Sequence, residues 1–382
     1  MTSRERVQMA LNHEEPDRVP LDIGGGSSSS IVVEGYENLK RHLGVYSESK
    51  ILNRVFRVAR LDNALLRRLG SDCHPLGVGP PQKWSPPPSE SGSFIDIWGL
   101  QWKETYYSQG CFYHELMNSP LAGAGIDDLE TYPWPDPLDP GYTAGLADQA
   151  KMLYEQTEYA IVGDGGFKSF WELGYLLRGY DAFLMDLIMN PDFVHALLGK
   201  LCEINLAATE RFLDIAGPYI QVFRTADDVA TQKGPLLSPE MYRRFIKPLY
   251  KRYYDLIKSK TDAKIFYHSC GNVMDLIADF IDNGLHIINP VQVSAMPDTA
   301  LLKKRFGDRL VFWGGVDTQR VLPVGSAQDV EQEVRLRIRD LAPGGGFVLA
   351  AVHNIQPDVP PENILAMTEA CRKFGRYPLR GL

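Results

Sequence analysis

The stretch Ile265-Phe266-Tyr267-His268-Ser269-Cys270-Gly271 decides how the rest of the chain is interpreted. Its first three residues form a short apolar run of the kind found in buried strands, and an imidazole and a thiol follow directly. In parallel barrels the catalytic side chains sit where the strands end, at the carboxyl-terminal face. The stretch therefore predicts a parallel α/β protein with an active site at the end of this strand.

Outward from this stretch, short apolar runs alternate with longer amphipathic ones. The predicted strands cover residues 18–23, 159–162, 219–223, 265–267, 287–289, 310–313 and 347–352. Helix-start signals stand between them, such as Ser238-Pro239 and Pro361-Glu362. This alternation indicates parallel strands joined by crossover helices. We expect an α/β fold, a (β/α)8 TIM barrel formed by one domain over residues 1–382, since barrels commonly reach roughly 250–400 residues with insertions.

Residues 75–143 differ in kind from the rest. They contain Pro80-Pro81, Pro86-Pro87-Pro88 and Pro133-Trp134-Pro135, with an aromatic, strand-like stretch over residues 94–113. The segment is too aromatic for a disordered linker. We interpret it as a long insertion that contains a hairpin and folds over the barrel.

Composition narrows the class of protein further. The net charge of −8 and the absence of a basic stripe argue against a nucleic-acid partner. No apolar run approaches the roughly 20 residues that span a bilayer, and the N-terminal residues resemble no signal peptide. Five scattered cysteines suit a reducing compartment without disulfides. We expect a cytoplasmic protein with neither nucleic-acid nor membrane partners.

Polar side chains follow six successive predicted strands, where a barrel enzyme holds its active site. We assign catalytic roles to four of them and substrate contacts to five. The catalytic candidates are Asp227, Asp228, Gln292 and Asp317, and the substrate-binding candidates are Asp164, Tyr267, Trp313, Asn354 and Gln356.

Three of the side chains that follow strands suit a metal ion. His268 and Cys270 lie two residues apart, and His353 follows a later strand that can converge on the same point. Two imidazoles and a thiolate suit Zn2+, and three protein ligands leave a position open for catalysis. His353 has an alternative interpretation as a general base or hydrogen-bond donor without a metal.

Three further features carry two interpretations each. One residue of the pair Asp227-Asp228 could be an acid/base or a fourth ligand, or could cap the following loop. The run Gly24-Gly25-Gly26-Ser27-Ser28-Ser29-Ser30 could cradle an anion, or be a flexible loop. Trp98, Trp134 and Trp313 could line a pocket or form a satellite core.

Several motifs across nearly the whole chain resemble those of the uroporphyrinogen decarboxylase-like family. The matching stretches are Arg4-Glu5-Arg6-Val7, Pro16-Asp17-Arg18-Val19-Pro20, Pro133-Trp134-Pro135, Gln232-Lys233-Gly234-Pro235-Leu236-Leu237-Ser238-Pro239, Tyr267-His268-Ser269-Cys270-Gly271, Trp313-Gly314-Gly315-Val316-Asp317, His353-Asn354-Ile355-Gln356 and Pro360-Pro361-Glu362-Asn363. The resemblance implies a (β/α)8 barrel.

That family contains two chemistries. True decarboxylases need no cofactor and hold the carboxylates of a porphyrinogen with arginines in an Arg-Gln-Ala-Gly-Arg-like stretch. This chain has Asp22-Ile23-Gly24-Gly25-Gly26 there, without an arginine, which argues against porphyrinogen decarboxylation. The other branch consists of zinc-dependent methyltransferases that work with corrinoid proteins and use a His-x-Cys pair plus a later Cys. His268 and Cys270 match the pair, whereas this chain has His353 at the third position.

The resemblance and the ligand set together predict the chemistry. A His/Cys/His site keeps about one more positive charge than a His/Cys/Cys site, so it is the stronger Lewis acid. We expect a Zn2+-dependent methyltransferase of the demethylase type, which moves a methyl group from a small methylated or methoxylated substrate to a corrinoid on a partner protein. The alternatives are a lyase or decarboxylase acting on a non-porphyrin acid and a catalytically silent small-molecule-binding barrel. The sequence leaves a homodimer open.

Overall fold

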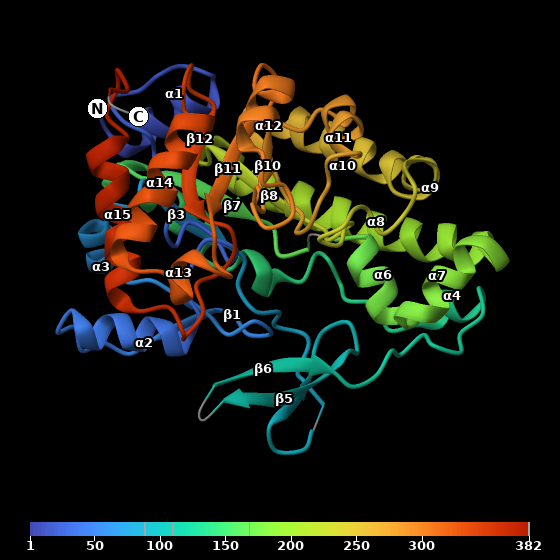
Figure 1. Ribbon diagram of the computed structural model, residues 1–382. Coiled ribbons are helices and arrows are strands. Elements are labelled where there is room, and N and C mark those ends of the chain that lie inside the picture. Colours follow the sequence, from blue (N-terminus) through green and yellow to red (C-terminus); the bar gives the residue numbers. More distant parts are fainter. Residues whose placement is uncertain (88, 109–110, 168, 381–382) are drawn as a thin grey trace.

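In the computed structural model, seven parallel strands curl into most of a barrel, with helices on the outside (Figure 1). The structure describes residues 1–87, 89–108, 111–167 and 169–380, so residues 88 and 109–110 of the predicted insertion lie outside it. Along the sheet the strands are β12 (Phe347–Ala351), β11 (Val311–Val316), β10 (Ile287–Asn289), β9 (Lys264–His268), β8 (Val222–Ala226), β7 (Ala160–Asp164) and β3 (Cys73–Gly77).

Residues 20–23 close the ring between β12 and β3. Leu21 forms a parallel bridge with Leu349 of β12, and the Leu21 carbonyl accepts a hydrogen bond of 2.7 Å from the N–H of Asp72, the residue before β3. The segment thus holds the place of an eighth strand, although its ladder contacts are too few to make it a regular one. This arrangement confirms the (β/α)8 fold expected from the sequence.

Ion pairs with the buried Asp72 fix the closing segment. The Asp72 carboxylate accepts hydrogen bonds from Arg6 and Arg18, each at 2.8 Å, and Arg6 also pairs with Asp17 at 2.7 Å. The arginines and Asp17 come from the N-terminal stretches that carry the family resemblance. Those stretches therefore serve the closure of the barrel.

Each strand is followed by helices that return the chain to the start of the next strand. After residues 20–23 come α2 (Val33–His42) and α3 (Asn63–Leu69). The other crossover helices are α5 (Leu146–Gln156), α8 (Pro191–Ala216), α10 (Lys247–Lys260), α11 (Ile277–Asn283), α12 (Thr299–Phe306), α14 (Ala327–Leu341) and α15 (Pro361–Phe374). Shorter elements stand beside them: α4 (Asp128–Thr131), α6 (Trp171–Arg178), α7 (Tyr180–Met189), α9 (Pro239–Phe245), α13 (Val321–Val324) and the 3-10 turns at Pro140–Thr143 and Gly217–Tyr219.

Helix α1 (Ser3–Leu11) closes the amino-terminal end of the barrel. Its Val7 and Leu11 belong to the same apolar cluster as the inward side chains of the strands, among them Phe266 and Trp313. The helix begins with a capping box in which Thr2 and Glu5 bond each other's backbone N–H groups. At this end the barrel interior is therefore a packed apolar core.

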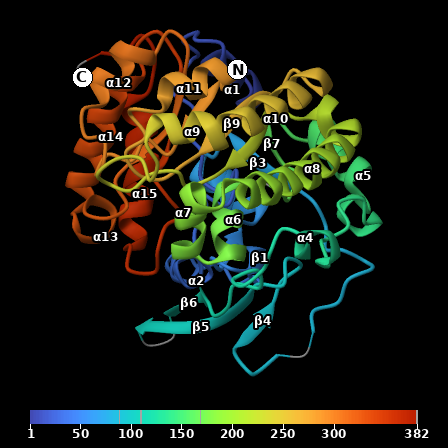
Figure 2. The same cartoon turned by 90° about the vertical axis from the view of Figure 1, so that its right-hand side faces the viewer.

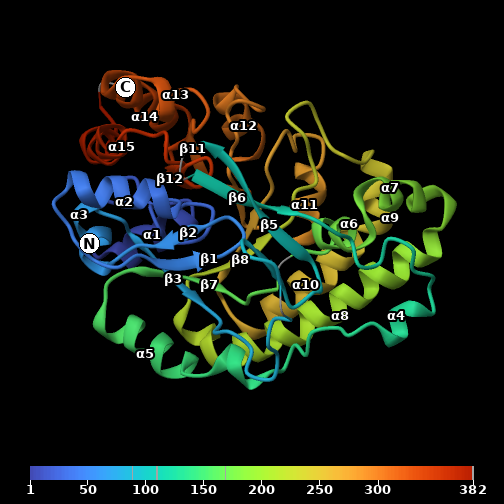
Figure 3. The same cartoon turned by 90° about the horizontal axis from the view of Figure 1, so that it is seen from below.

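The predicted insertion lies at that other end. It contains a three-stranded antiparallel sheet of β4 (Ser93–Ile95), β5 (Gln101–Ser108) and β6 (Cys111–Leu116), below the barrel and away from α1 in two views (Figures 1 and 2). Seen from below, β5 and β6 cross in front of the molecule (Figure 3). The hairpin β1 (Lys50–Asn53) and β2 (Val58–Arg60) lies nearby. The first three residues of the predicted insertion, 75–77, belong to β3 instead.

One predicted strand begins later than expected. Residues 219–223 were predicted to be extended, but Gly217–Tyr219 form a 3-10 turn after α8, and β8 runs from Val222 to Ala226. Among the described residues, no helix has both the length and the apolar character needed to cross a bilayer.

Candidate metal centre and active site

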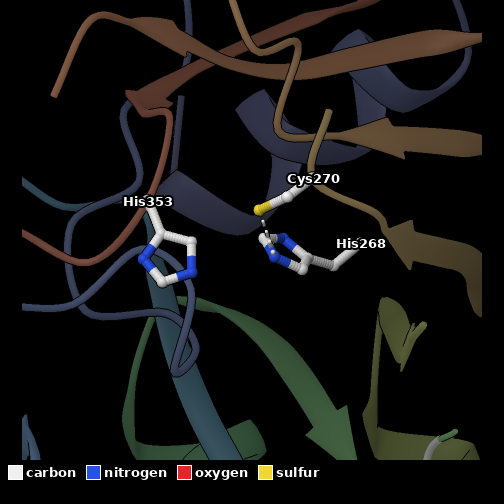
Figure 4. Close-up of side chains that lie close together, drawn as sticks. All are labelled: His268, Cys270 and His353. Carbon is white, nitrogen blue, oxygen red and sulfur yellow. Dashed lines mark hydrogen bonds between the residues drawn. The ribbon is translucent and has the colours of Figure 1, made fainter. Parts of the chain in front are cut away.

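His268, Cys270 and His353 converge at the carboxyl-terminal mouth of the barrel. His268 ends β9 and Cys270 follows it, whereas His353 follows β12, which β10 and β11 separate from β9. One potential ligand atom from each side chain lies within 4.8 Å of the other two, and Cys270 Sγ is 3.4 Å from His268 Nε2. Figure 4 shows His353 facing the other two side chains from the opposite side.

The Nδ1 atom of His268 is engaged by Asn289, which lies beside it on β10. Asn289 in turn donates a hydrogen bond of 2.8 Å from Nδ2 to the carbonyl of Trp313 on β11. This second bond turns the Asn289 amide oxygen toward the imidazole, so that Nδ1 carries the proton and Nε2 keeps its lone pair. An outer partner of this kind commonly fixes a metal-ligating histidine.

His353 is oriented in the same manner. Its Nδ1 contacts the amide oxygen of Asn354, and that oxygen also accepts a hydrogen bond of 2.9 Å from Gln356 Nε2. Burial lowers the pKa of His353 from its usual value, with smaller opposing effects from Asn354 and Asp228. His353 is therefore a neutral imidazole at neutral pH, which is the form that binds metals.

Cys270 and Asp228 are joined through the backbone. The Cys270 N–H donates a hydrogen bond of 2.8 Å to Asp228 Oδ1. Burial, and then the negative charge of Asp228, raise the pKa of the Cys270 thiol. The thiol is therefore protonated in the absence of a cation, while a bound metal ion would stabilise its thiolate.

The carboxylate of Asp227 is fully buried and holds a helix in place. Its carboxylate accepts hydrogen bonds from the N–H groups of Phe170, Trp171 and Glu172 at 2.7–3.0 Å and from the Tyr250 hydroxyl at 3.0 Å. Those N–H groups open α6, so Asp227 caps this helix from another strand end. Of the two neighbouring aspartates, Asp228 is the one that contacts the ligand set.

The metal-ligand candidates separate two cavities. The central cavity, about 290 Å³, is lined by His268, His353, Asp228 and Arg224, and by Glu172 of α6. Trp98 of the insertion and Phe167 also line it, in edge-to-face contact with ring centroids 5.6 Å apart. Trp134 packs on Trp98 rather than on the cavity. The insertion thus completes an aromatic wall opposite the metal ligands.

The outer cavity, about 310 Å³, lies on the other side of the metal-ligand candidates. Its lining includes Cys270, His353, Asn354, Gln356, Gln292 and Asp317. Gln292 accepts a hydrogen bond of 2.6 Å from the N–H of Gly271, and Asp317 accepts two from the backbone of Gln319 and Arg320. Both residues therefore shape the loops of the mouth, and their polar groups border this cavity.

The structure places Tyr267 and Trp313 away from both cavities, which corrects the expectation that they contact substrate. Tyr267 points outward and packs on Tyr250 and Phe280, because neighbours of an inward residue on a strand face the other way. Trp313 lies in the barrel core, where its Nε1 donates to Asp22 at 2.9 Å. Their roles are structural: Trp313 positions Asn289 through its carbonyl.

Asp164 ends β7 and borders a third cavity, described below, where it lies 3.4 Å from Arg224. Sequence reasoning missed Arg224, Glu172 and the supporting role of Asn289. Arg224 had a usable signal: it lies two residues after the inward Val222, and strand side chains alternate. Glu172 had none, since α6 takes its position from the distant Asp227.

The fold and this mouth define a class of protein: a (β/α)8 barrel with three potential metal ligands and flanking cavities at the carboxyl ends of its strands. The sequence profile of the family described as Uroporphyrinogen decarboxylase (URO-D) matches residues 118–374. The chain belongs to this family.

The chain is also similar to individual relatives in sequence and to a solved structure in fold. The chain is 25% identical over 240 residues to a uroporphyrinogen decarboxylase of Coxiella burnetii, a match spanning 60% of this chain and 62% of the relative. It is 25% identical over 299 residues to that of Xanthomonas euvesicatoria, spanning 74% and 77%. A solved methyltransferase from Methanosarcina mazei shares the fold, with a TM-score of 0.67 at 20% identity over 98% of this chain and 99% of that one.

Proposed function

We propose that this protein is a zinc-dependent methyltransferase that demethylates a small methylated or methoxylated compound and passes the methyl group to a corrinoid held by a partner protein. The observation that carries the proposal is the convergence of His268, Cys270 and His353 within 4.8 Å. The shared fold with a protein described as a methyltransferase supports the reaction class.

The three side chains fit a zinc ion. Tetrahedral Zn2+ with nitrogen and sulfur ligands places neighbouring ligand atoms about 3.3–3.6 Å apart. The separation of 3.4 Å between Cys270 Sγ and His268 Nε2 already matches this range. The ligand atoms of all three side chains lie within 4.8 Å of one another, so small side-chain adjustments would bring them to tetrahedral distances. Asn289 and Asn354 prepare both imidazoles to bind through Nε2.

A zinc ion with one thiolate and two neutral imidazoles keeps a net positive charge and acts as a Lewis acid toward a leaving oxygen. Around it, this chain supplies the binding site. Asp228 fixes the backbone of Cys270. Trp98 and Phe167 line the central cavity with aromatic surface. The outer cavity borders Cys270 and His353 from another side than the central cavity, which we assign to the substrate, so a second reactant could reach the metal ligands from there.

The test is an anaerobic assay with a reduced corrinoid protein and a panel of methyl donors, with methylation of the corrinoid followed by absorbance. His268→Ala should lose metal and activity together. His353→Cys should retain metal yet lose demethylation, because a second thiolate weakens the Lewis acid. His42→Ala, at an exposed position on α2, is the matched control.

Three results would contradict the proposal. Unchanged turnover by metal-free protein would reject the role of zinc. If no donor methylates the corrinoid while a carboxylic acid releases CO2, the lyase alternative replaces the methyltransferase. A metal-free, inactive protein that binds small molecules would instead be the silent barrel.

A further inference from the structure

Arg224 brings a buried guanidinium with unused donors to the mouth of the barrel. Its side chain is only 6% exposed, and its Nε is buried without a hydrogen-bond partner among the described residues. The structure records for Arg224 a hydrogen bond of 3.4 Å from Nη1 to Asp164. A guanidinium carries five N–H donors, and leaving buried donors unpaired is costly. The arrangement therefore calls for an acceptor beyond those that the described residues supply.

The acceptor has a place to bind. A third cavity, which we call the arginine cavity, has a volume of about 290 Å³ and is lined by Arg224, Arg60, Asp164, Gly25 and Gly26. Arg60 ends β2, is half-buried and has no ion pair among the described residues. Gly26 brings the backbone close to Arg224, since a Cβ there would lie 3.5 Å from Arg224 Cδ. Two arginines from separate elements thus face one cavity.

The arginine cavity lies next to the central cavity. The two share the residues Ser27, Asn53, Gly166 and Arg224. Because Arg224 lines both cavities, a molecule paired with it lies beside the space that His268 and His353 line. Trp98 and Phe167 line the space between the polar ends with aromatic surface.

We propose that Arg224 and Arg60 form a subsite for the carboxylate of an aromatic acid whose methylated end lies beside His268 and His353. This inference rests on the proposed function for the identity of the reacting group. Among the described residues that line the arginine cavity, two arginines and Asp164 sum to one net positive charge, which matches a monoanion better than a phosphate dianion. The planar guanidinium also suits the two oxygens of a carboxylate.

These two arginines are distinct from the N-terminal arginine stretch of porphyrinogen decarboxylases, which this chain lacks. A carboxylate that anchors the substrate is also a different arrangement from a carboxylate placed to be lost. The methyl group, not the acid, is the part of the substrate that the metal ligands face.

The test measures binding of matched probes by isothermal titration calorimetry, on protein whose zinc content is known and again after chelation. The probes are 4-methoxybenzoate, its neutral amide 4-methoxybenzamide, the corresponding sulfonate, and 4-methoxyphenyl phosphate. Wild type should bind the benzoate at least about 10-fold more tightly than the amide, since hydrogen bonds to charged groups are the stronger class.

Variants locate the effect. Arg60→Gln and Arg224→Gln should each weaken benzoate binding about 10- to 100-fold and leave amide binding nearly unchanged. Arg309→Gln, an exposed arginine paired with Asp308, should change neither. Arg60 is half-buried, so its variant remains informative if loss of the buried Arg224 prevents folding.

Equal affinity of wild type for benzoate and benzamide, including no binding of either, overturns the subsite, and so does tighter binding of the phosphate. Failure of the proposed function gives a different pattern. Preference for the benzoate without any corrinoid methylation leaves the subsite standing and removes the methyltransferase. Methyl transfer that occurs only from neutral donors leaves the methyltransferase standing and removes the carboxylate subsite.

Discussion

The amide side chain of Asn289 is the residue on which the geometry of His268 depends, because it joins the imidazole to the Trp313 carbonyl. Asn289→Ala should weaken zinc binding about 10- to 100-fold, as outer partners of metal-ligating histidines typically do. Competition with a chromogenic chelator measures this. Asn38→Ala on α2 is the control, and an unchanged zinc affinity in Asn289→Ala would remove Asn289 from the site.

Asp22 gives the barrel a pH-dependent stability. Burial raises its pKa from 3.8 to about 6, although the carboxylate accepts hydrogen bonds from Gly25 and Trp313. A carboxyl group with a raised folded-state pKa adds stability that is present below pH 4 and lost as the pH rises through 6. The rise of the Asp22 pKa from 3.8 to about 6 corresponds to a change of about 3 kcal/mol in the free energy of unfolding between these pH limits.

Asp22→Asn does not titrate in this range, so it should be more damaging relative to wild type at pH 4.5 than at pH 7.5. Urea unfolding at both pH values measures the difference. If Asp22→Asn lowered the free energy of unfolding by the same amount at both pH values, or by more at pH 7.5, the raised pKa of Asp22 would be contradicted.

At the scale of elements, Asp227 follows β8 and accepts hydrogen bonds from the N–H groups that open α6. We therefore expect Asp227 to act on stability and its neighbour Asp228 to act on the metal site. Asp227→Asn should cost about 2–4 kcal/mol of unfolding free energy, since several buried donors lose a charged acceptor. Zinc content of the folded variant should stay unchanged. Asp228→Ala should cost less stability but weaken zinc binding, because it releases the backbone of Cys270. If Asp228→Ala cost more stability than Asp227→Asn, and Asp227→Asn lost zinc while Asp228→Ala kept it, the roles assigned to the two aspartates would be wrong.

The elements also show what the sequence could and could not predict. The strand that ends at His268 was recognisable because its apolar run and its polar end are contiguous. The orientation of Tyr267 was not, since a three-residue apolar run does not tell which neighbour faces inward. The position of Glu172 depends on the bonds from the N–H groups that open α6 to Asp227, which join residues 55–57 positions apart, and no local pattern encodes them.

At the scale of the whole molecule, function and stability lie at opposite ends of the barrel. Helix α1 plugs one end with Val7 and Leu11, and the other end holds the ligand set under the β4–β6 sheet. The (β/α)8 class followed from the alternation of runs and from the family motifs. The closing residues 20–23 could be assigned from position, but their hold on the barrel comes from Asp72, a buried carboxylate with no sequence signature.

The central claim is that His268, Cys270 and His353 bind one zinc ion together. The most direct measurement is elemental analysis of the purified protein after zinc addition and dialysis, with wild type beside His268→Ala, Cys270→Ala, His353→Ala and the control His42→Ala. We predict about one zinc per chain in wild type and control, and a large loss in each of the three ligand variants. Wild type without zinc, or variants that retain it in full, would contradict the account.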